Sequence, residues 1–258
     1  MTTIDYVHGY GPHESRRLGD QADTLAGLLH AGTAYPPGSR VLEAGCGVGA
    51  QTVHLVRSSP GAHLTSIDVD ETSLAQARTR ASGVDFRHAS LFDLDEEFDH
   101  VFVCFVLEHL TEPERALAHL RGLLTPGGTI TVIEGDHGSA FFHPDDPAAH
   151  RVIDCLVTLQ RRAGGDALIG RRVEPLLTAA GFRDVRTHPC TVYADRTRPE
   201  LVEGFTRNTF TAMVAGVAAE AVAAGLVTES EWRQGIDALA RTAEGTFHYA
   251  FFKGTATR

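Results

Sequence analysis

The chain has 258 residues, of which 33 are acidic and 23 basic, and its formal net charge is −10 at pH 7. That charge would repel a phosphate backbone and an anionic membrane surface, which argues against a nucleic-acid or membrane partner. The four cysteines form no C-x-x-C pair, so neither a disulfide framework nor a zinc ribbon is predicted. The N-terminus lacks the apolar segment of a signal peptide, and we expect a cytoplasmic protein.

From residue 40 onward, short β-branched runs alternate with helix-like segments, which is typical of βαβ units and a parallel sheet. The apolar run at 98–107 fits a central strand covered on both faces. The strands predicted in this part of the chain are 40–45, 63–69, 84–89, 98–107 and 129–134. The predicted helices are one after Gly49, then 71–82 and 112–124.

The second half of the chain predicts two more strands and a helical insertion. A helix at 171–180 leads through Gly181 into a strand that ends near Ala194, and 246–257 alternates well enough to close the sheet. Residues 199–244 read as helical and, with 147–163, are interpreted as a lid over the carboxyl edge of the sheet. The predicted fold is therefore α/β: a doubly wound, Rossmann-like sheet of seven mostly parallel strands with helical lid insertions. The predicted divisions are an N-terminal helical lid segment (1–35), a core (36–198 and 245–258) and an insertion over the acceptor site (199–244).

The stretch VLEAGCGVGA at 41–50 fits two kinds of cofactor site. Gly45, Gly47 and Gly49 satisfy both a dinucleotide fingerprint, G-x-G-x-x-A, and a tighter G-x-G-x-G turn preceded by an acid at Glu43. Open parallel sheets bind ligands beyond the carboxyl end of the first strand, where these glycines lie. Asp68 ends the second strand 19 residues past Gly49, a place suited to accepting ribose hydroxyls in either kind of site.

Glu43 distinguishes the dinucleotide site from the other kind of cofactor site. A carboxylate so close to the first glycine is unfavourable beside a pyrophosphate but favourable beside an ammonium or sulfonium group. We therefore predict a cationic cofactor. The order of the later segments agrees: Ser90 follows the third strand, FVLEHL follows the fourth, and LLTPGGTITVIEGD leads into the fifth.

Four segments in this order, VLEAGCGVG, SIDVD, FDHVFVCFVLEHL and LTPGGTITVIE, resemble a class I S-adenosylmethionine-dependent methyltransferase. The resemblance covers roughly residues 36–135. The opening YVHGYGPHESRRL is also similar to the N-terminal helix of small-molecule methyltransferases that include the teleocidin-type C-methyltransferases. S-adenosylmethionine is the cofactor that this resemblance implies.

The resemblance also implies roles for individual residues. Ser90 stands where many family members carry an Asp or Asn that reads the adenine amine, with Leu91 beside it. Gly45, Gly47 and Gly49 would line the methionine and ribose, supported by Glu43, and Asp68 would take the ribose hydroxyls. Val106, with Glu108 or His109 just beyond, would lie under the methionine end, and Arg17 or Tyr10 would close over it.

The segment after the fifth strand carries the candidate catalytic residues. This loop is expected to open onto the place where an acceptor presents its nucleophile, so His137 and His143, with Asp136, are candidate acid–base groups. The acidic and histidine side chains from Asp136 to His150 match no zinc or calcium spacing, and no metal site is predicted.

These observations predict methyl transfer from S-adenosylmethionine to a small, partly apolar acceptor, such as a natural-product or secondary-metabolite intermediate. The atom methylated, whether C, O, S or N, and the identity of the acceptor stay open. Two alternatives remain: a nicotinamide-dependent oxidoreductase that uses the same glycines, and a non-catalytic module that binds S-adenosylmethionine. The sequence does not indicate a homo-oligomer.

Overall fold

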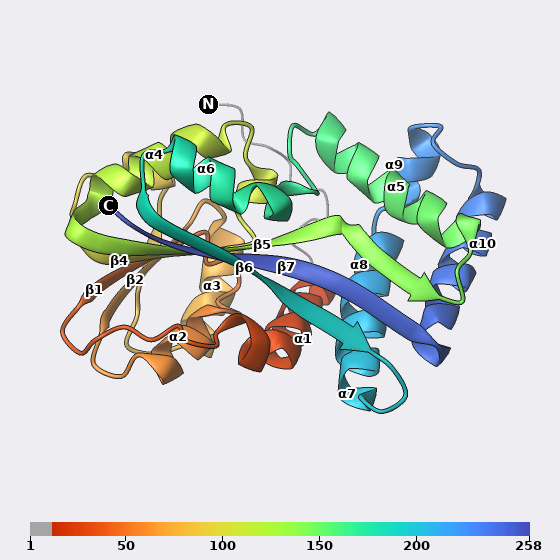
Figure 1. Cartoon of the computed structure of the whole chain (residues 1–258), viewed down its shortest axis with the longest axis horizontal. Coiled ribbons are helices and arrows are strands. Elements are labelled where there is room, and N and C mark those ends of the chain that lie inside the picture. The colour runs from red at the N-terminus through yellow and green to blue at the C-terminus, as the bar shows by residue number, and fades with distance from the viewer. Residues whose placement is uncertain (1–11) are drawn as a thin grey trace. The chain divides into compact units, whose positions relative to one another are not determined.

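The computed structural model describes residues 12–258, with side chains from Ser15 onward, and places seven strands of these residues in one sheet (Figure 1). Its order is β3-β2-β1-β4-β5-β7-β6. β1 pairs in parallel with β2 and β4, β2 with β3, and β4 with β5. The strands are β1 (Arg40–Ala44), β2 (His63–Asp68), β3 (Asp85–His88), β4 (Phe98–Cys104), β5 (Leu124–His143), β6 (Arg183–Ala194) and β7 (Thr246–Thr257). The predicted Rossmann-like, seven-stranded and mostly parallel sheet is confirmed.

The helices begin where the sequence supplies capping groups. The Asp70 side chain accepts the Ser73 amide at the start of α3, and Thr228 forms a capping box with Glu231 at the start of α10. The helices are α1 (Pro12–Leu29), α2 (Thr52–Ser58), α3 (Glu71–Arg80), α4 (Pro113–Leu123), α5 (Pro147–Arg162), α6 (Val173–Ala179), α7 (Pro199–Leu201), α8 (Ala212–Ala215), α9 (Ala218–Ala223) and α10 (Glu229–Arg241). Among residues 12–258, no helix combines the length and the apolar character that crossing a bilayer requires.

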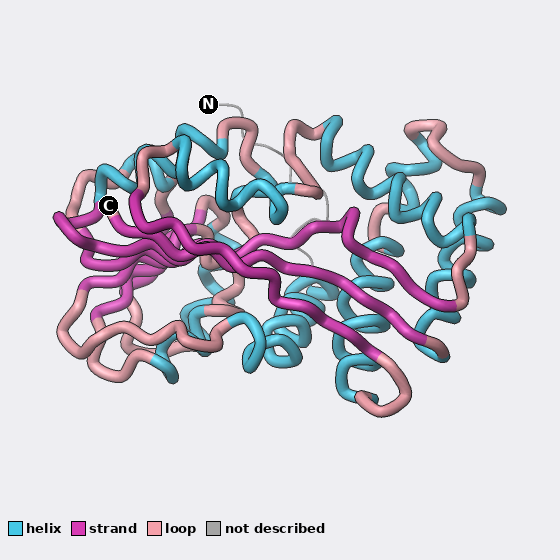
Figure 2. The backbone as a smooth tube through the Cα atoms, in the orientation of Figure 1, coloured by secondary structure: helices cyan, strands magenta, loops and turns pink. Residues whose placement is uncertain are grey.

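Two strand ends differ from the sequence expectation. β4 ends at Cys104, three residues before the predicted end at 107, because Phe105 adopts a left-handed backbone angle (φ 59°). β5 extends far beyond the predicted 129–134 and reaches His143, as the long strands of Figure 2 show. Asp136 and His137 therefore lie within a strand and not in a loop after it. Glycine and charged residues are uncommon in strands, so the segment GDHG gave no indication that the fifth strand continues beyond residue 134.

The chain separates into two compact units. One consists of the described residues up to Leu25 with 135–168 and 191–251, and the other of 26–134, 169–190 and 252–258. We call the second the glycine-loop unit, since it contains Gly45–Gly49, and the first the histidine unit, since it contains His137. These cuts differ from the predicted boundaries of 1–35, 36–198 with 245–258, and 199–244, which stay a prediction.

In the glycine-loop unit, α4 and α6 cover one face of the sheet, and α2 and α3 lie on the other (Figure 1). Leu42, Val101 and Ile130 from three neighbouring strands join Leu117 of α4 and Leu177 of α6 in one buried apolar cluster. Each fully buried side chain of this size contributes roughly 1.5–3 kcal/mol. This burial fixes the strand ends from which the glycine loop emerges.

In the histidine unit, residues 199–244 are mostly helical, as predicted, and include a π-helix over Val202–Thr211. Two glycines permit close helix contacts. A Cβ at Gly204 would collide with Thr24 of α1, and a Cβ at Gly235 of α10 would lie 2.7 Å from the Ala148 carbonyl oxygen of α5. A buried aromatic cluster packs beside these helices; its members are Phe205, Phe210, Phe247, Tyr249 and Phe251.

The single lysine of the chain closes the end of α1. Lys253 is buried on β7, and its ammonium group donates to the Leu29 carbonyl (2.9 Å), the Ala31 carbonyl (2.7 Å) and the Thr33 hydroxyl (2.6 Å). The last carbonyl groups of a helix have no partner within it and attract cations. Lys253 therefore ties the last strand of the sheet to the segment that leads into β1.

Replacing Lys253 with Met should lower the free energy of unfolding by roughly 3 kcal/mol or more, because buried acceptors lose their charged donor. Urea denaturation of wild type and Lys253→Met measures this change. Arg233→Met, at an exposed basic side chain of α10, is the matched control and should be nearly neutral. A Lys253→Met variant as stable as wild type would show that these contacts add nothing to the fold.

Candidate functional site

The loop between β1 and α2 holds three glycines in the left-handed region: Gly45 (φ 75°), Gly47 (φ 51°) and Gly49 (φ 76°). Two of them also permit close packing. A Cβ at Gly45 would lie 2.5 Å from Val106 Cγ2, and one at Gly49 would lie 2.9 Å from the Ala77 Cα. Around Gly47 there is nothing within 4 Å of the place where a Cβ would lie. The loop is thus packed at both ends and open in the middle, which leaves its backbone approachable by a ligand.

Asp68 fixes this loop from the end of β2. Its Oδ2 accepts the Gly47 amide at 2.7 Å and its Oδ1 accepts the Asp70 amide at 2.9 Å. Burial raises the pKa of Asp68, and these two amide donors oppose that effect. A carboxylate oxygen has more than one lone pair, so Asp68 retains capacity to accept ligand hydroxyls beside Gly47.

Glu43 is buried beneath the loop. Its Oε2 accepts hydrogen bonds from the Thr52 hydroxyl (2.6 Å) and the Ser66 hydroxyl (2.7 Å), which join β1 to α2 and β2. Burial raises the pKa of Glu43 to about 7, although both hydroxyl donors oppose the shift. The structure thus gives Glu43 a supporting contact with the elements on each side of the loop, α2 and β2.

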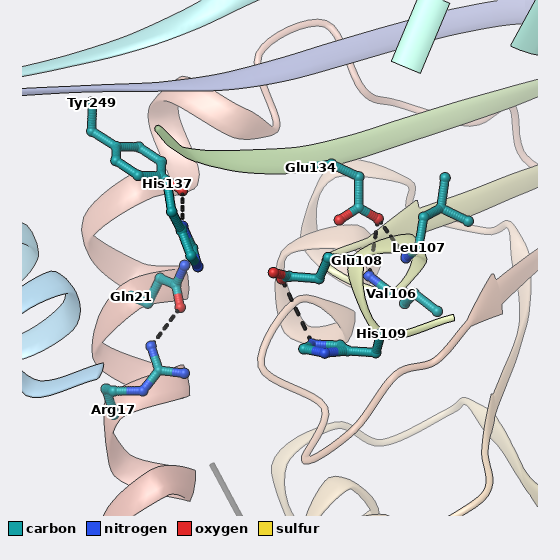
Figure 3. A network of polar contacts seen from close by, with 9 residues as sticks. All are labelled: Arg17, Gln21, Val106, Leu107, Glu108, His109, Glu134, His137 and Tyr249. Carbon is teal, nitrogen blue, oxygen red and sulfur yellow. Dashed lines mark hydrogen bonds and ion pairs between the residues drawn. The ribbon is translucent and has the colours of Figure 1, made fainter. Parts of the chain in front are cut away.

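The turn after β4 carries Val106 and His109. The Val106 amide donates to Glu134 Oε1 at 3.0 Å and the Leu107 amide to the same oxygen at 2.7 Å, while His109 Nε2 lies 3.6 Å from Glu108 Oε1 (Figure 3). Sequence reasoning did not single out Glu134. An acid directly after the apolar run ITVI is the signal that would have marked it, since a buried carboxyl group needs partners.

Ser90 and Leu91 lie after β3, where the adenine contact is predicted. The Ser90 hydroxyl accepts the Phe92 amide at 3.3 Å, and Asp93 accepts the Ser90 amide at 3.2 Å, which makes a capping box for a short 3-10 turn. Leu91 packs against the apolar cluster of the glycine-loop unit. Ser90 thus already serves as a helix cap, and its contact with an adenine stays a prediction.

The histidine unit holds Asp136, His137 and Arg17, all buried. His137 Nδ1 shares a hydrogen bond with the Tyr249 hydroxyl (2.7 Å), and Asp136 Oδ1 accepts the Gly138 amide at 3.0 Å. The Arg17 guanidinium donates to Gln21 Oε1 at 3.1 Å; Figure 3 shows this pair and the His137 pair. The sequence did not mark Tyr249, because no local pattern points to a partner 112 residues from His137. Gln21 was also missed, although it lies four residues from Arg17 on α1, a spacing that places both on one face of a helix.

His143 lies apart from the other candidate catalytic residues. It is exposed at the end of β5, six residues after His137, or roughly 20 Å along a strand. Tyr10 lies outside the described residues. Within the described part of the chain, His, Cys, Asp and Glu nowhere form a group of three or more that could hold a metal ion. The roles predicted for all these site residues stay predictions.

Comparison with known proteins relates this chain to methyltransferases. Residues 42–130 match a family model described as a methyltransferase domain. The chain is 31% identical over 188 residues to an uncharacterized 37.1 kDa protein in transposon TN4556 of Streptomyces fradiae, covering 70% of this chain and 54% of that protein. It is 35% identical over 123 residues to the demethylmenaquinone methyltransferase of Clavibacter sepedonicus, covering 45% and 47%. The chain therefore spans about half the length of these curated relatives.

Among solved structures, the chain is similar to the Haemonchus contortus phosphoethanolamine N-methyltransferase 2 in complex with S-adenosyl-L-methionine. The TM-score is 0.57 with 19% identity, over 92% of this chain and 52% of that one. This likeness concerns the fold.

The stability of the glycine-loop unit should depend on pH through Glu43. Its pKa is raised from 4.5 to about 7, so its contribution is fully present below pH 4.5 and is lost as pH rises through about 7. The free energy of unfolding should therefore fall by roughly 3 kcal/mol more in wild type than in Glu43→Gln between pH 4.5 and 8.

Urea denaturation at several pH values measures this difference, with Glu112→Gln, an exposed acid, as the matched control. The amide of Glu43→Gln can still accept from both hydroxyls, so the variant is expected to fold. Parallel pH profiles for wild type and Glu43→Gln would refute the raised pKa.

Proposed function

We propose that this chain, which belongs to the class I S-adenosylmethionine-dependent methyltransferases, transfers a methyl group to a small, partly apolar acceptor. The family's cofactor, S-adenosylmethionine, supplies an already activated methyl group. The observation that carries the proposal is the open backbone at Gly47 beside the Asp68 carboxylate. We further propose a natural-product or secondary-metabolite intermediate as the acceptor.

The donor set of the glycine-loop unit fits this cofactor. A glycine without neighbours at its Cβ position leaves room for the methionine and ribose portion, and Asp68 offers acceptor capacity for ribose hydroxyls. Asp68 fits either kind of cofactor, but Glu43, which is buried on β1 beneath the loop, does not suit a pyrophosphate, because its ionised form would repel the phosphates. This charge favours a sulfonium cofactor over a nicotinamide dinucleotide.

In methyl transfer the protein mainly positions the two reactants and does not need to form a covalent intermediate with either of them. The acceptor atom forms a bond to the methyl carbon as the carbon–sulfur bond breaks, and the electron pair leaves with the thioether sulfur. The protein then has to hold the reactants in line, exclude water and, where the acceptor carries a proton, receive that proton. His137 is our candidate for the last task, since Tyr249 fixes its ring through Nδ1.

The proposed acceptor class has two sources of support. The name of the Clavibacter relative, a demethylmenaquinone methyltransferase, identifies a quinone-type small molecule as the acceptor of that protein. In the chain itself, His137 lies beside two aromatic rings, with the Phe210 ring centroid 6.2 Å away and the Tyr249 centroid 5.9 Å away. Surroundings of this kind suit an apolar acceptor better than a highly charged one.

Asp68→Asn should weaken binding of S-adenosylhomocysteine by about 10- to 100-fold, because a charge-assisted hydrogen bond contributes roughly 1.5–3 kcal/mol. Isothermal titration calorimetry measures the affinity. Asp85→Asn, an exposed acid on β3, is the control and should bind like wild type. Unchanged affinity in folded Asp68→Asn would remove Asp68 from the site. Tight binding of NAD without binding of S-adenosylhomocysteine would overturn the proposed function.

His137→Ala should lower turnover far more than it lowers affinity for S-adenosylhomocysteine, by on the order of 10²–10⁴ if His137 accepts the acceptor's proton. The deficit should shrink for acceptors that are already deprotonated. Single-turnover rates with a panel of phenols and thiols of graded acidity test this, and His150→Ala, at a surface histidine, is the control. A deficit that does not vary with acceptor acidity would make His137 a packing residue.

A further inference from the structure

The turn after β4 contains a strained residue. Phe105 has a φ of 59°, which is uncommon for a bulky side chain. The other non-glycine residue with positive φ in the described part of the chain is Asp184, and aspartate tolerates this region better. Strained backbone persists only where its surroundings hold it in place. The contacts around Phe105 should therefore include the group that holds this turn.

β5 supplies that group. The Phe105 amide donates to the Ile133 carbonyl at 2.9 Å, and the next two amides, of Val106 and Leu107, both donate to Glu134 Oε1. Three consecutive amides of the turn are thus bound by two neighbouring residues of β5; Figure 3 shows the two hydrogen bonds to Glu134. Glu134 is fully buried, so water does not replace these hydrogen bonds.

The position of the turn matters for the glycine loop because Val106 lies directly against Gly45. A Cβ at Gly45 would lie 2.5 Å from Val106 Cγ2 and 3.1 Å from Val106 Cγ1. The space between the two segments therefore has no room for a side chain at position 45, and Val106 fills it. A displacement of the Val106 backbone would either push the loop or uncover it.

We propose that Glu134 is a positioning residue for the cofactor site: its carboxyl group holds the strained turn so that Val106 covers the first glycine of the loop. The inference rests on the proposed function, because the glycine loop is the cofactor site under that proposal. Glu134 acts through Val106 and Leu107 and touches neither reactant.

The second oxygen of Glu134 indicates which replacement preserves this role. Oε2 is buried without a hydrogen-bond partner, and Glu108 lies close enough to affect its ionisation. Burial, followed by the charge of Glu108, raises the pKa of Glu134 well above its usual value. In its neutral form Glu134 presents one oxygen that accepts hydrogen bonds from two amides. The side-chain oxygen of a glutamine can accept the same two hydrogen bonds. Glu134→Gln is therefore the conservative variant, and Glu134→Leu removes the acceptor at similar size.

The test measures two quantities for wild type, Glu134→Gln and Glu134→Leu. Hydrogen–deuterium exchange of the peptide spanning 104–109, in cofactor-free protein, reports whether the turn is held. Calorimetric titration with S-adenosylhomocysteine reports whether the site is formed. We expect Glu134→Leu to exchange faster in this peptide and to bind at least about tenfold more weakly, and Glu134→Gln to stay within about threefold of wild type. Circular dichroism establishes that each variant is folded.

Two results would overturn the inference. One is a folded Glu134→Leu variant with wild-type exchange and affinity. The other is a Glu134→Gln variant as impaired as Glu134→Leu. That result would mean that the turn depends on the charge of Glu134 and not on its ability to accept two hydrogen bonds. If Glu134→Leu does not fold, Glu134→Asp replaces it: the side chain is one methylene shorter, so it should lose affinity where Glu134→Gln retains it. A wild-type protein that fails to bind S-adenosylhomocysteine would instead overturn the proposed function. The hydrogen–deuterium exchange of residues 104–109 would then be the measurement that shows whether Glu134 holds the turn.

Discussion

The hydrogen bond from the Gly47 amide to Asp68 is the contact on which the arrangement of the glycine loop depends. It joins the segment that leaves β1 to the carboxyl end of β2, and parallel pairing of these strands brings the two ends to the same edge of the sheet. A loop of left-handed glycines has many conformations open to it, and the partly buried carboxylate of Asp68, which accepts the central amide, selects one. Glu43 supports the loop from below and Val106 packs beside Gly45, while the backbone at Gly47 stays open.

Burial of acidic groups is the cost of building the site in this way. Glu43, Asp68 and Glu134 all have a raised pKa, and in each case desolvation is the largest cause. Each is held by donors from another element: hydroxyls for Glu43 and backbone amides for Asp68 and Glu134. These three acids lie on β1, β2 and β5, and their hydrogen bonds connect the strands to the glycine loop, to α2 and to the turn after β4. The unit thereby prepares its geometry before a ligand arrives.

The sequence predicted those parts of the molecule that depend on local signals. The ends of β1 and β2, the glycine loop and Asp68 were found because apolar runs, glycines and a strand-terminal acid are adjacent in the chain. The length of β5 was missed because glycine and charged residues interrupt its apolar pattern after Ile133. Glu134, Tyr249 and Lys253 were missed for another reason. Their partners are 27, 112 and 224 residues away, and only the folded chain brings such pairs together.

The position of Lys253 also affects how the protein responds to amine chemistry. The chain has a single lysine, and that lysine is 3% exposed with its ammonium group bound to three oxygens. Reagents such as succinimidyl esters and aldehydes, which acylate or condense with surface lysines on most proteins, meet no exposed ε-amine here. Reactivity at Lys253 itself would then serve as a chemical signal that the last strand has separated from the end of α1.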